Sequence, residues 1–232
     1  MIYNHCVTTL LPDQLKQVSV FSVLDRPDLA RLAGAAISRQ YPAGGFLTRT
    51  GDCWPYLFLV VEGHLNILKE SSEGRSLVIA ELEPGELFWG LAFFQEDVPN
   101  PVTLQFNQPS SLHLWSRAEI LPILLENGSF SWELSRLMVD RMVHASEVIE
   151  GLAFQPVSGR LARMLLDDFE SAGDISISRH LTLDDMAARI GTTREMVCRA
   201  LYRFAGSKLI DVTRTEFTLT DKDGLRRMAE GS

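Results

Sequence analysis

The chain of 232 residues has few cysteines and no long hydrophobic run. Its three cysteines, Cys6, Cys53 and Cys198, are far apart and odd in number, which favours neither a disulfide framework nor a CxxC metal site. Such sparse cysteine use is typical of a reducing compartment, so we expect a cytoplasmic protein. No apolar run reaches the ~18 residues of a transmembrane helix. The N-terminus lacks the basic and apolar regions of a signal peptide, and we expect no membrane partner.

Histidine pairs with metal-ligand spacing are also absent. The five histidines form no HxH or HExxH pair; they are His5, His64, His113, His144 and His180. Zinc and related metals need clustered nitrogen, sulfur or carboxylate ligands. The sequence therefore predicts no metal site and no catalytic centre, and it disfavours the main enzyme alternative, a metal-dependent cupin.

The formal net charge of −8 argues at first against a nucleic-acid partner, but the charge is unevenly distributed. The first 156 residues hold 10 Lys and Arg against 18 Asp and Glu, whereas residues 157–232 hold 12 of each kind. Between Arg189 and Lys208 there are five basic residues and one acid, Glu195. Positive charge is thus concentrated where a phosphate backbone could lie.

That basic stretch belongs to a predicted helix-turn-helix, Leu181–Ile210. Thr182 is suited to cap a first helix ending near Ile190, and Gly191 suits a sharp turn with positive φ. Thr192 or Thr193 then caps a second helix. The second helix has an apolar face and a polar one; the apolar residues are Met196, Val197, Ala200, Leu201 and Phe204.

The polar face of the second helix carries the side chains that read base edges in a major groove. Arginine pairs with guanine and glutamate accepts from cytosine, so we expect base reading by Arg194, Glu195, Cys198 and Arg199. We expect phosphate contacts from Thr182, Thr192, Thr193, Arg203 and Lys208. The alternatives are a helical hairpin inside an enzyme, or a signalling or ligand-binding module whose two helices bind protein instead of DNA.

Upstream of the helix-turn-helix, the pattern predicts a β-roll, one long helix and a hinge. Leu10–Ala36 is typical of a short pair of helices, and Arg39–Gly45 of a turn. Short strands with Gly, Pro and Asp turns then indicate a sandwich or small jelly roll. We expect these strands at Phe46–Arg49, Pro55–Val61, His64–Lys69, Ser76–Leu82, Val102–Phe106 and Ser111–Trp115.

A helix from about Ser129 to Leu152 carries residues at alternating spacings of three and four, which favours a parallel two-helix coiled coil. The predicted dimer seam consists of Ser135, Met138, Met142, Ala145, Ile149 and Leu152. After the hinge at Phe154–Pro156 we expect a helix Val157–Glu170, a strand within Gly173–Ser178, a wing hairpin Ile210–Leu219 and a last short helix. The alternative is an ordinary amphipathic helix buried on its own domain.

The motif Thr193–Arg199, TREMVCR, resembles the recognition helix of the CRP/FNR superfamily of bacterial transcription regulators. Gly51-Asp52, Tyr56–Val60, Glu62-Gly63 and Pro84–Glu86 resemble that family's cyclic-nucleotide-binding-type β-roll. The resemblance implies an α+β fold with a jelly-roll-like sensing domain (1–128), a dimerisation helix (129–153) and a winged helix-turn-helix DNA-binding domain (154–232). It also implies a homodimer on an inverted-repeat, TGTGA-like operator, and RNA polymerase as a partner.

The effector pocket departs from the cyclic-AMP pattern of that family. Leu91 stands where the acid that holds the ribose would be, and Asn100-Pro101 where an Arg-Ser pair would hold the phosphate. No Lys or Arg occurs from Ser76 to Ser116, and a buried phosphate without a partner charge is costly. We therefore expect that cyclic AMP is not a tight ligand. The candidate pocket comprises Phe88, Trp89, Gly90, Leu91, Asn100, Pro101, Met138, Arg141 and Met142.

The aromatic residues around this segment leave two interpretations open. They pack the core of the roll, or they line a pocket for a flat apolar ligand such as haem, with His64, His113 or His144 as axial ligand. An iron–sulfur cluster is disfavoured, because only Cys6 lies near the N-terminus. Cys198 is either a small residue fitted against DNA or a thiol whose oxidation adds bulk there.

Overall fold

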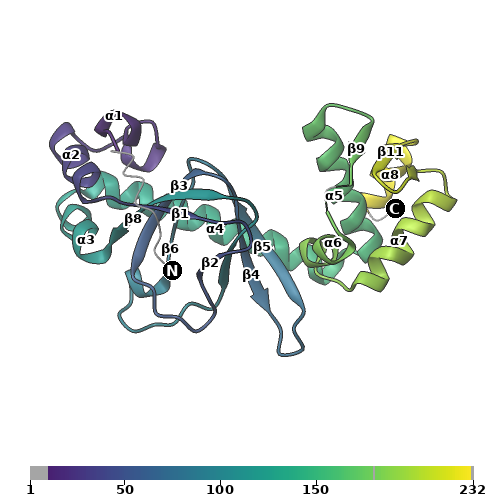
Figure 1. Ribbon diagram of the computed structural model, residues 1–232, viewed down its shortest axis with the longest axis horizontal. Helices are drawn as coiled ribbons and strands as arrows, with labels where there is room; N and C mark the ends of the chain where they lie inside the picture. Colours follow the sequence, from purple (N-terminus) through teal and green to yellow (C-terminus); the bar gives the residue numbers. More distant parts are fainter. Residues whose placement is uncertain (1–9, 180, 231–232) are drawn as a thin grey trace. The chain divides into compact units, whose positions relative to one another are not determined.

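The computed structural model describes residues 10–179 and 181–230 and divides into two compact units (Figure 1). The N-terminal unit comprises the chain up to Lys69 together with Ile79–His144. The C-terminal unit comprises Glu70–Val78 together with the chain from Ala145 onward. Within the described residues no helix is long and apolar enough to cross a membrane.

The chain begins with the predicted short helices. These are α1 (Pro12–Leu15), the 3₁₀ turn η1 (Ser19–Phe21) and α2 (Arg26–Ala35). Asp25 caps α2, since its carboxylate accepts a hydrogen bond from the Asp28 amide at 2.9 Å. Leu15, Phe21 and Leu32 are fully buried, so these helices close one end of the roll's core.

Two four-stranded antiparallel sheets form the roll, with strand orders β1-β8-β3-β6 and β2-β7-β4-β5. Their alternating strands present apolar side chains inward, as the sequence predicted. The strands are β1 (Ile37–Tyr41), β2 (Phe46–Thr48), β3 (Tyr56–Glu62), β4 (Leu65–Glu70), β5 (Ser76–Leu82), β6 (Leu87–Trp89), β7 (Thr103–Phe106) and β8 (Ser110–Ser116), with a 3₁₀ turn η2 (Leu91–Phe93) between β6 and β7.

The structure corrects the sequence analysis at three elements. Arg39–Tyr41 was expected in a turn but lies in β1, which pairs with β8 from Ile37 opposite Leu114 to Tyr41 opposite Ser110. Pairing with a long neighbouring strand overrides the polar local composition here. Strand β6 and helix α3 (Arg117–Glu126) were not predicted. Strand β6 has only three residues. Helix α3 contains Pro122, and proline is disfavoured in the interior of a helix.

The core of the roll is aromatic and aliphatic. Trp115 is fully buried, and its indole Nε1 donates to the Leu32 carbonyl at 2.7 Å, so the one polar atom of the ring is satisfied. Phe21 packs edge-on against Trp115, with the ring centroids 5.5 Å apart. This contact joins the N-terminal helices to β8.

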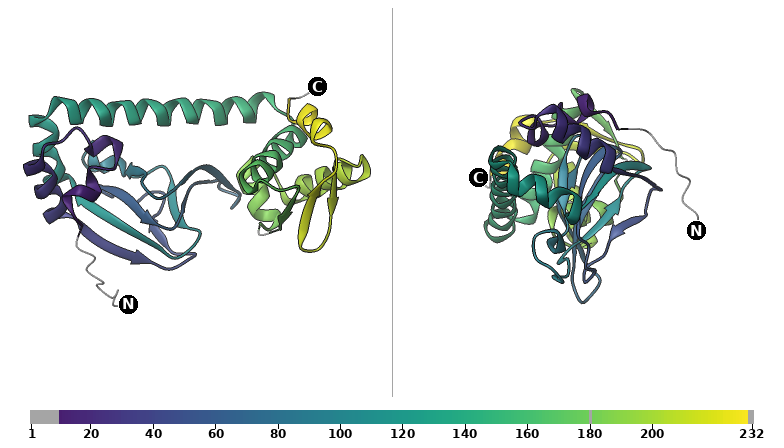
Figure 2. Two further views of the ribbon diagram at one scale, coloured as in Figure 1. Left: turned by 90° about the horizontal axis from the view of Figure 1, so that it is seen from above. Right: turned by 90° about the vertical axis from the view of Figure 1, so that its left-hand side faces the viewer.

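The long helix α4 (Gly128–Phe154) follows α3 and is uninterrupted over its 27 residues (Figure 2). Phe130 and Leu134, in its first turns, are buried in the N-terminal unit. Along the rest of the helix, several large apolar side chains are exposed. The part from Ala145 onward belongs to the C-terminal unit.

The C-terminal unit is a winged helix-turn-helix, as predicted. A three-stranded antiparallel sheet in the order β10-β11-β9 accompanies its helices. Leu161, Leu165, Val197, Phe204 and Leu225 are fully buried in one core. The elements are α5 (Val157–Ala172), β9 (Ser176–Ser178), α6 (Leu183–Ile190), α7 (Arg194–Gly206), β10 (Ile210–Val212), β11 (Glu216–Leu219) and α8 (Lys222–Glu230).

Candidate nucleic-acid interface and sensing domain

The first helix of the helix-turn-helix starts at a reciprocal cap. The Thr182 hydroxyl accepts from the Asp185 amide at 3.1 Å, and the Asp185 carboxylate accepts from the Thr182 amide at 2.9 Å. This capping box satisfies two amides that the helix itself leaves free. The predicted cap at Thr182 is confirmed, and its side chain is therefore occupied by the structure of the helix end.

Gly191 forms the turn between α6 and α7, with φ of +63°. A Cβ atom at this position would lie 2.4 Å from the Leu152 Cδ2 atom, closer than atoms can pack. The positive φ favours glycine, and any larger residue would also have to displace the Leu152 side chain. Thr193 then caps α7, accepting from the Met196 amide at 3.4 Å.

Helix α7 has one buried face and one exposed face. Val197 and Phe204 are fully buried and Leu201 nearly so, which anchors the helix in the core of the C-terminal unit. The opposite face is exposed, with Cys198 half-buried among its charged neighbours. The exposed charged and tyrosine side chains are Arg194, Glu195, Arg199, Tyr202 and Arg203. Met196, which was expected on the apolar face, is 39% exposed. The predicted base-reading residues thus share one surface.

Charges on this surface interact with one another. The Thr193 side chain, the backbone amide of Glu195 itself, and Arg194 and Arg199 together hold the pKa of Glu195 below its usual value. Glu195 is therefore an ionised hydrogen-bond acceptor at neutral pH. The Arg194 guanidinium also pairs with Asp184 on α6, with Nη1 3.0 Å from Oδ2.

Three features of this surface were not anticipated from sequence. Asp184 pairs with Arg194, which lies ten positions away on the next helix. Tyr202 is 76% exposed on the same face as Arg199. Its spacing of three from Arg199 is the signal in the sequence that places it on this face. Lys208 adopts a positive φ of 57° directly after α7, which turns the chain toward β10.

The Arg160 guanidinium of α5 joins two helix ends within the C-terminal unit. Its Nε donates to the Ile190 carbonyl at 2.7 Å and its Nη2 to the Gly191 carbonyl at 3.3 Å. Its Nη1 donates to the Gln155 carbonyl at 2.6 Å and to the Gly151 carbonyl at 3.4 Å. Carbonyls at helix C-terminal ends are unsatisfied and carry partial negative charge, so a cation is stabilised there.

In the N-terminal unit, Asn100 is buried, and its polar groups are used internally. The side-chain Oδ1 accepts from the Leu91 amide at 2.9 Å, and Nδ2 donates to the Thr48 hydroxyl at 3.1 Å. Gly90 is required by packing, since a Cβ there would lie 1.9 Å from the Trp54 carbonyl oxygen. These candidate pocket residues hold neighbouring segments together in this structure.

The aromatic side chains of this region mostly pack the core. Phe93 is 2% exposed, and Phe88 and Trp89 pack against buried clusters on either side of β6. Phe88 and Trp89 stack with their centroids 5.3 Å apart. Leu91 and Phe94 are both 38% exposed at the surface. The aromatic residues were expected either to pack the core or to line a pocket for a flat ligand. Phe88, Trp89 and Phe93 pack the core.

Two cations, Lys69 and the candidate pocket residue Arg141, form polar contacts in this part of the N-terminal unit. Lys69, at the end of β4, donates through Nζ to the Pro101 carbonyl at 2.7 Å. Arg141 of α4 donates through Nη2 to the Glu86 carboxylate at 2.9 Å, while its buried Nε has no partner among the described residues. The segment that lacks basic residues in sequence therefore has Lys69 beside it in space.

Comparison with known proteins places these two units in one family. The model of the cyclic nucleotide-binding domain matches residues 38–127, and that of the Crp-like helix-turn-helix domain matches residues 159–228. A CRP-like cAMP-activated global transcriptional regulator of Mycobacterium tuberculosis is 22% identical over 222 residues, covering 93% of this chain and 98% of the relative. The cAMP-activated global transcriptional regulator Vfr of Pseudomonas aeruginosa is 25% identical over 191 residues, with coverages of 79% and 89%.

Solved structures agree with this assignment. A putative transcriptional regulator of the CRP/FNR family from Eubacterium rectale superposes with a TM-score of 0.77 at 20% identity, covering 91% of this chain and 98% of that one. The c-di-GMP responsive regulator CLP of Xanthomonas campestris gives 0.73 at 22% identity, with coverages of 84% and 99%. The chain belongs to the CRP/FNR superfamily. It is a transcription regulator with a helix-turn-helix DNA-binding domain, and its relatives are regulators, not enzymes.

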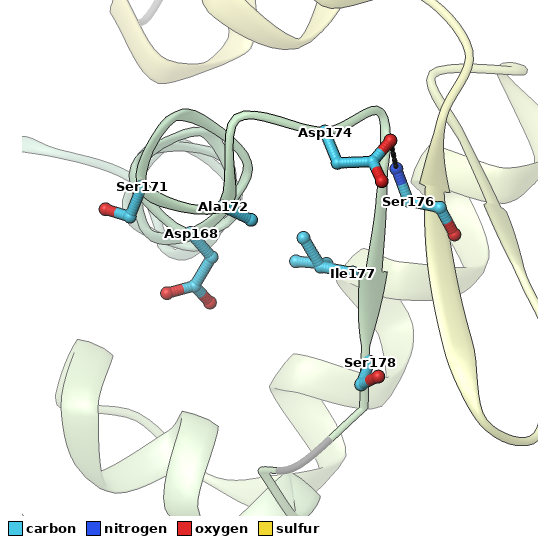
Figure 3. Close-up of a pocket in the computed structure, with 7 residues that line it drawn as sticks. All are labelled: Asp168, Ser171, Ala172, Asp174, Ser176, Ile177 and Ser178. Atoms are coloured by element: carbon cyan, nitrogen blue, oxygen red, sulfur yellow. Dashed lines mark hydrogen bonds between the residues drawn. The ribbon is translucent and has the colours of Figure 1, made fainter.

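Among the surface cavities of this CRP/FNR regulator, two are lined entirely by described residues. One, of about 610 Å³, is lined by Cys53, Ala92, Arg117 and Leu121 among others. The other, of about 510 Å³, lies between the end of α5 and β9 and is lined by Asp168, Asp174 and serines, with Asp174 accepting from the Ser176 amide (Figure 3). The described residues include no group of three or more His, Cys, Asp or Glu side chains placed to hold a metal ion.

The three candidate haem ligands each have a partner in the CRP/FNR roll. His113 is buried, its Nδ1 lies 2.9 Å from the Ser38 hydroxyl, and burial lowers its pKa. His64 contacts Gln108, and the Nε2 of His144 lies 3.2 Å from the Ile79 carbonyl. None of them lines either of the two cavities described above. His5, His180 and Cys6 lie outside the described residues.

We predict that Arg160→Lys destabilises this regulator by about 1–3 kcal/mol, because hydrogen bonds from a charged donor contribute roughly 1.5–3 kcal/mol each and an ammonium cannot span both helix ends. Urea unfolding of the full-length protein, followed by circular dichroism, measures the change. Arg163→Lys, an exposed arginine of the same helix, is the matched control. Equal stability of the two variants would contradict a joining role for Arg160.

Proposed function

We propose that this protein regulates transcription by reading an inverted-repeat operator with helix α7 of each protomer in a homodimer. The observation that carries the proposal is the shared exposed face of α7, on which Arg194, Glu195 and Arg199 stand together while the other face is held in the core. Arg194 and Arg199 contact guanines, and Glu195 accepts from a cytosine amino group. Cys198, half-buried between them, fits against the bases.

The proposed phosphate contacts fix the orientation of α7 in the groove. Arg203 and Lys208 are exposed cations at the C-terminal end of the helix. Thr182, Thr192 and Thr193 lie at the N-terminal ends of α6 and α7, where free amides favour phosphate. The Thr193 hydroxyl accepts from a capping amide, so Thr193 contacts phosphate through its hydroxyl proton or its backbone amide. The Thr182 amide and hydroxyl both donate to Asp185, so Thr182 contacts phosphate only where these bonds open.

The proposed dimer forms along α4, where large apolar side chains are left exposed. Trp132 is 67% exposed, Val139 56%, Met142 71% and Ile149 66%. With Ser135 and Ser146 these positions recur at alternating spacings of three and four, which is the geometry of a coiled-coil seam. A second copy of this chain covers such a face because the same apolar stripe is present on both helices.

This exposed stripe shares Ser135, Met142 and Ile149 with the seam expected from sequence and differs from it elsewhere. Ala145 and Leu152 are half-buried within their own chain, and Leu152 lies against Gly191. Met138 is 36% exposed, less than its neighbour Val139. We therefore propose a seam that includes Trp132, Val139 and Ser146 in place of Met138, Ala145 and Leu152.

We further propose three functional parts: an effector-sensing roll (1–128), a dimerisation helix (129–153) and a DNA-binding domain (154–232). RNA polymerase is the proposed protein partner on DNA. The effector is not cyclic AMP, although relatives named above carry cyclic AMP in their names. Leu91 offers no acid for a ribose, and the side-chain oxygen and nitrogen of Asn100 are engaged with Leu91 and Thr48.

The DNA-reading proposal is tested by selecting binding sites from random duplexes and measuring affinity for matched and mismatched operators. Glu195→Ala is expected to lower discrimination at one position by about 1–3 kcal/mol. Lys208→Ala is expected to weaken binding to all sequences alike and to reduce the salt dependence by roughly one counterion. Equal losses for Glu195→Ala on matched and mismatched DNA would remove Glu195 from the base-reading set.

The dimer proposal is tested by two neighbouring substitutions on α4. Val139→Asp is expected to raise the dimer dissociation constant at least about tenfold, because an unpaired charge in the seam is costly to bury. Met138→Asp is expected to have a smaller effect. Analytical ultracentrifugation measures both. A larger effect at Met138 would restore the seam expected from sequence, and monomeric wild-type protein would contradict the dimer itself.

The effector proposal is tested by titration calorimetry of the full-length protein with cyclic AMP. No binding is expected in the micromolar range, because a phosphate in this segment lacks the family's arginine partner. A micromolar dissociation constant would contradict the proposal. Loss of that cyclic AMP binding in the Lys69→Ala variant would then identify Lys69 as the cation that replaces the arginine.

A further inference from the structure

We propose that Asp184 is a positioning residue for base reading: its carboxylate holds the Arg194 guanidinium in the orientation that reads guanine, and its charge disfavours DNA on which Arg194 finds no guanine. This inference rests on the proposed function, since it assigns a role to a residue beside the reading face of α7. Asp184 is outside both residue sets proposed above for base and phosphate contacts.

The contact itself crosses from the first to the second helix of the motif. Arg194 Nη1 lies 3.0 Å from Asp184 Oδ2, within the range of a charge-assisted hydrogen bond. Asp184 is in the first turn of α6 and Arg194 is the first residue of α7, so the pair spans the turn at Gly191. The pair therefore links a base-reading side chain to a helix that does not itself carry that function.

The geometry of the guanidinium leaves the reading edge available. A guanidinium has five donors in a fixed planar fork, and the pair with Asp184 is made through Nη1. Nε and Nη2 then remain as the two parallel donors that a guanine O6 and N7 accept. Arg194 can keep Asp184 while it reads the base, which reduces the side-chain freedom lost on binding.

Asp184 differs in this respect from its neighbour Asp185. The Asp185 carboxylate accepts from both the amide and the hydroxyl of Thr182 and so serves the helix cap. Asp184 is exposed, with 67% of its side chain accessible, and its carboxylate pairs with Arg194. Negative charge in a first helical turn stabilises the helix dipole but also stands where a phosphate would bind. Asp184 therefore weakens contacts that depend on phosphate alone.

Binding-site selection with full-length variants tests the role. Arg194→Ala first identifies the base position that Arg194 reads, and Arg199→Ala identifies a second position as an internal reference. Asp184→Asn is expected to lower discrimination roughly 3- to 5-fold at the Arg194 position, the fold-change that corresponds to an exposed ion pair of up to about 1 kcal/mol. Discrimination at the Arg199 position is expected to stay unchanged, while affinity for mismatched DNA rises. Asp184→Glu is expected to restore part of the loss.

Asp223→Asn is the matched control, since Asp223 is also an acid in the first turn of a helix, with an exposed ion pair to Arg226. It removes the same charge outside the two helices of the motif. Unchanged discrimination at the Arg194 position in Asp184→Asn, or an equal change in Asp223→Asn, would overturn the inference. If the wild-type protein selects no sequence motif, the proposed function fails instead, so the two failures are distinguishable.

Discussion

The Arg160 guanidinium connects three helices of the C-terminal unit through their main chains. It donates to carbonyls at the end of α4 and to carbonyls at the end of α6, so one side chain of α5 serves two helix termini. Burial lowers the pKa of Arg160, but opposing helix-end dipoles favour the cation, which stays protonated. Because four acceptors converge on one planar group, a shift of either helix end disturbs several hydrogen bonds at once. The four hydrogen bonds of Arg160 therefore hold the ends of α4 and α6 in one arrangement relative to α5.

Gly191 allows the end of α4 to pack closely against the turn between α6 and α7. Its positive φ turns the chain between α6 and α7, and the absence of a side chain lets Leu152 of α4 lie against it. The residue that shapes the helix-turn-helix is thus also the residue that seats the motif beside the end of α4. Leu152 and Arg160 thus connect the end of α4 to the helix-turn-helix through packing and main-chain hydrogen bonds, which tolerate little distortion.

In the N-terminal unit, residues expected at the effector pocket are engaged in internal bonds and packing. Asn100 bridges Leu91 and Thr48, and Gly90 is required by the close approach of the Trp54 carbonyl. Phe88, Trp89 and Phe93 fill core space. The glycine that matches the family is explained by packing alone, so it is no indication of a ligand. Charged side chains of neighbouring elements also form contacts here: Lys69 donates to the Pro101 carbonyl, and Arg141 pairs with Glu86.

The sequence by itself determined the helix-turn-helix closely, because its signals are local. Thr182 and Thr193 define helix starts through their side-chain hydroxyls, Gly191 defines a helix end through its backbone, and the apolar spacing of α7 defines most of its buried face. The strand order, β1, β6 and α3, and the partners of Arg160, Arg194 and Lys69 were decided only by the tertiary structure. Many of these contacts join residues far apart in the sequence: Arg194 and Asp184 are ten positions apart, Arg160 and Ile190 thirty, and Lys69 and Pro101 thirty-two. A local pattern shows which side chains can form an interaction, but only the folded chain decides which of them meet.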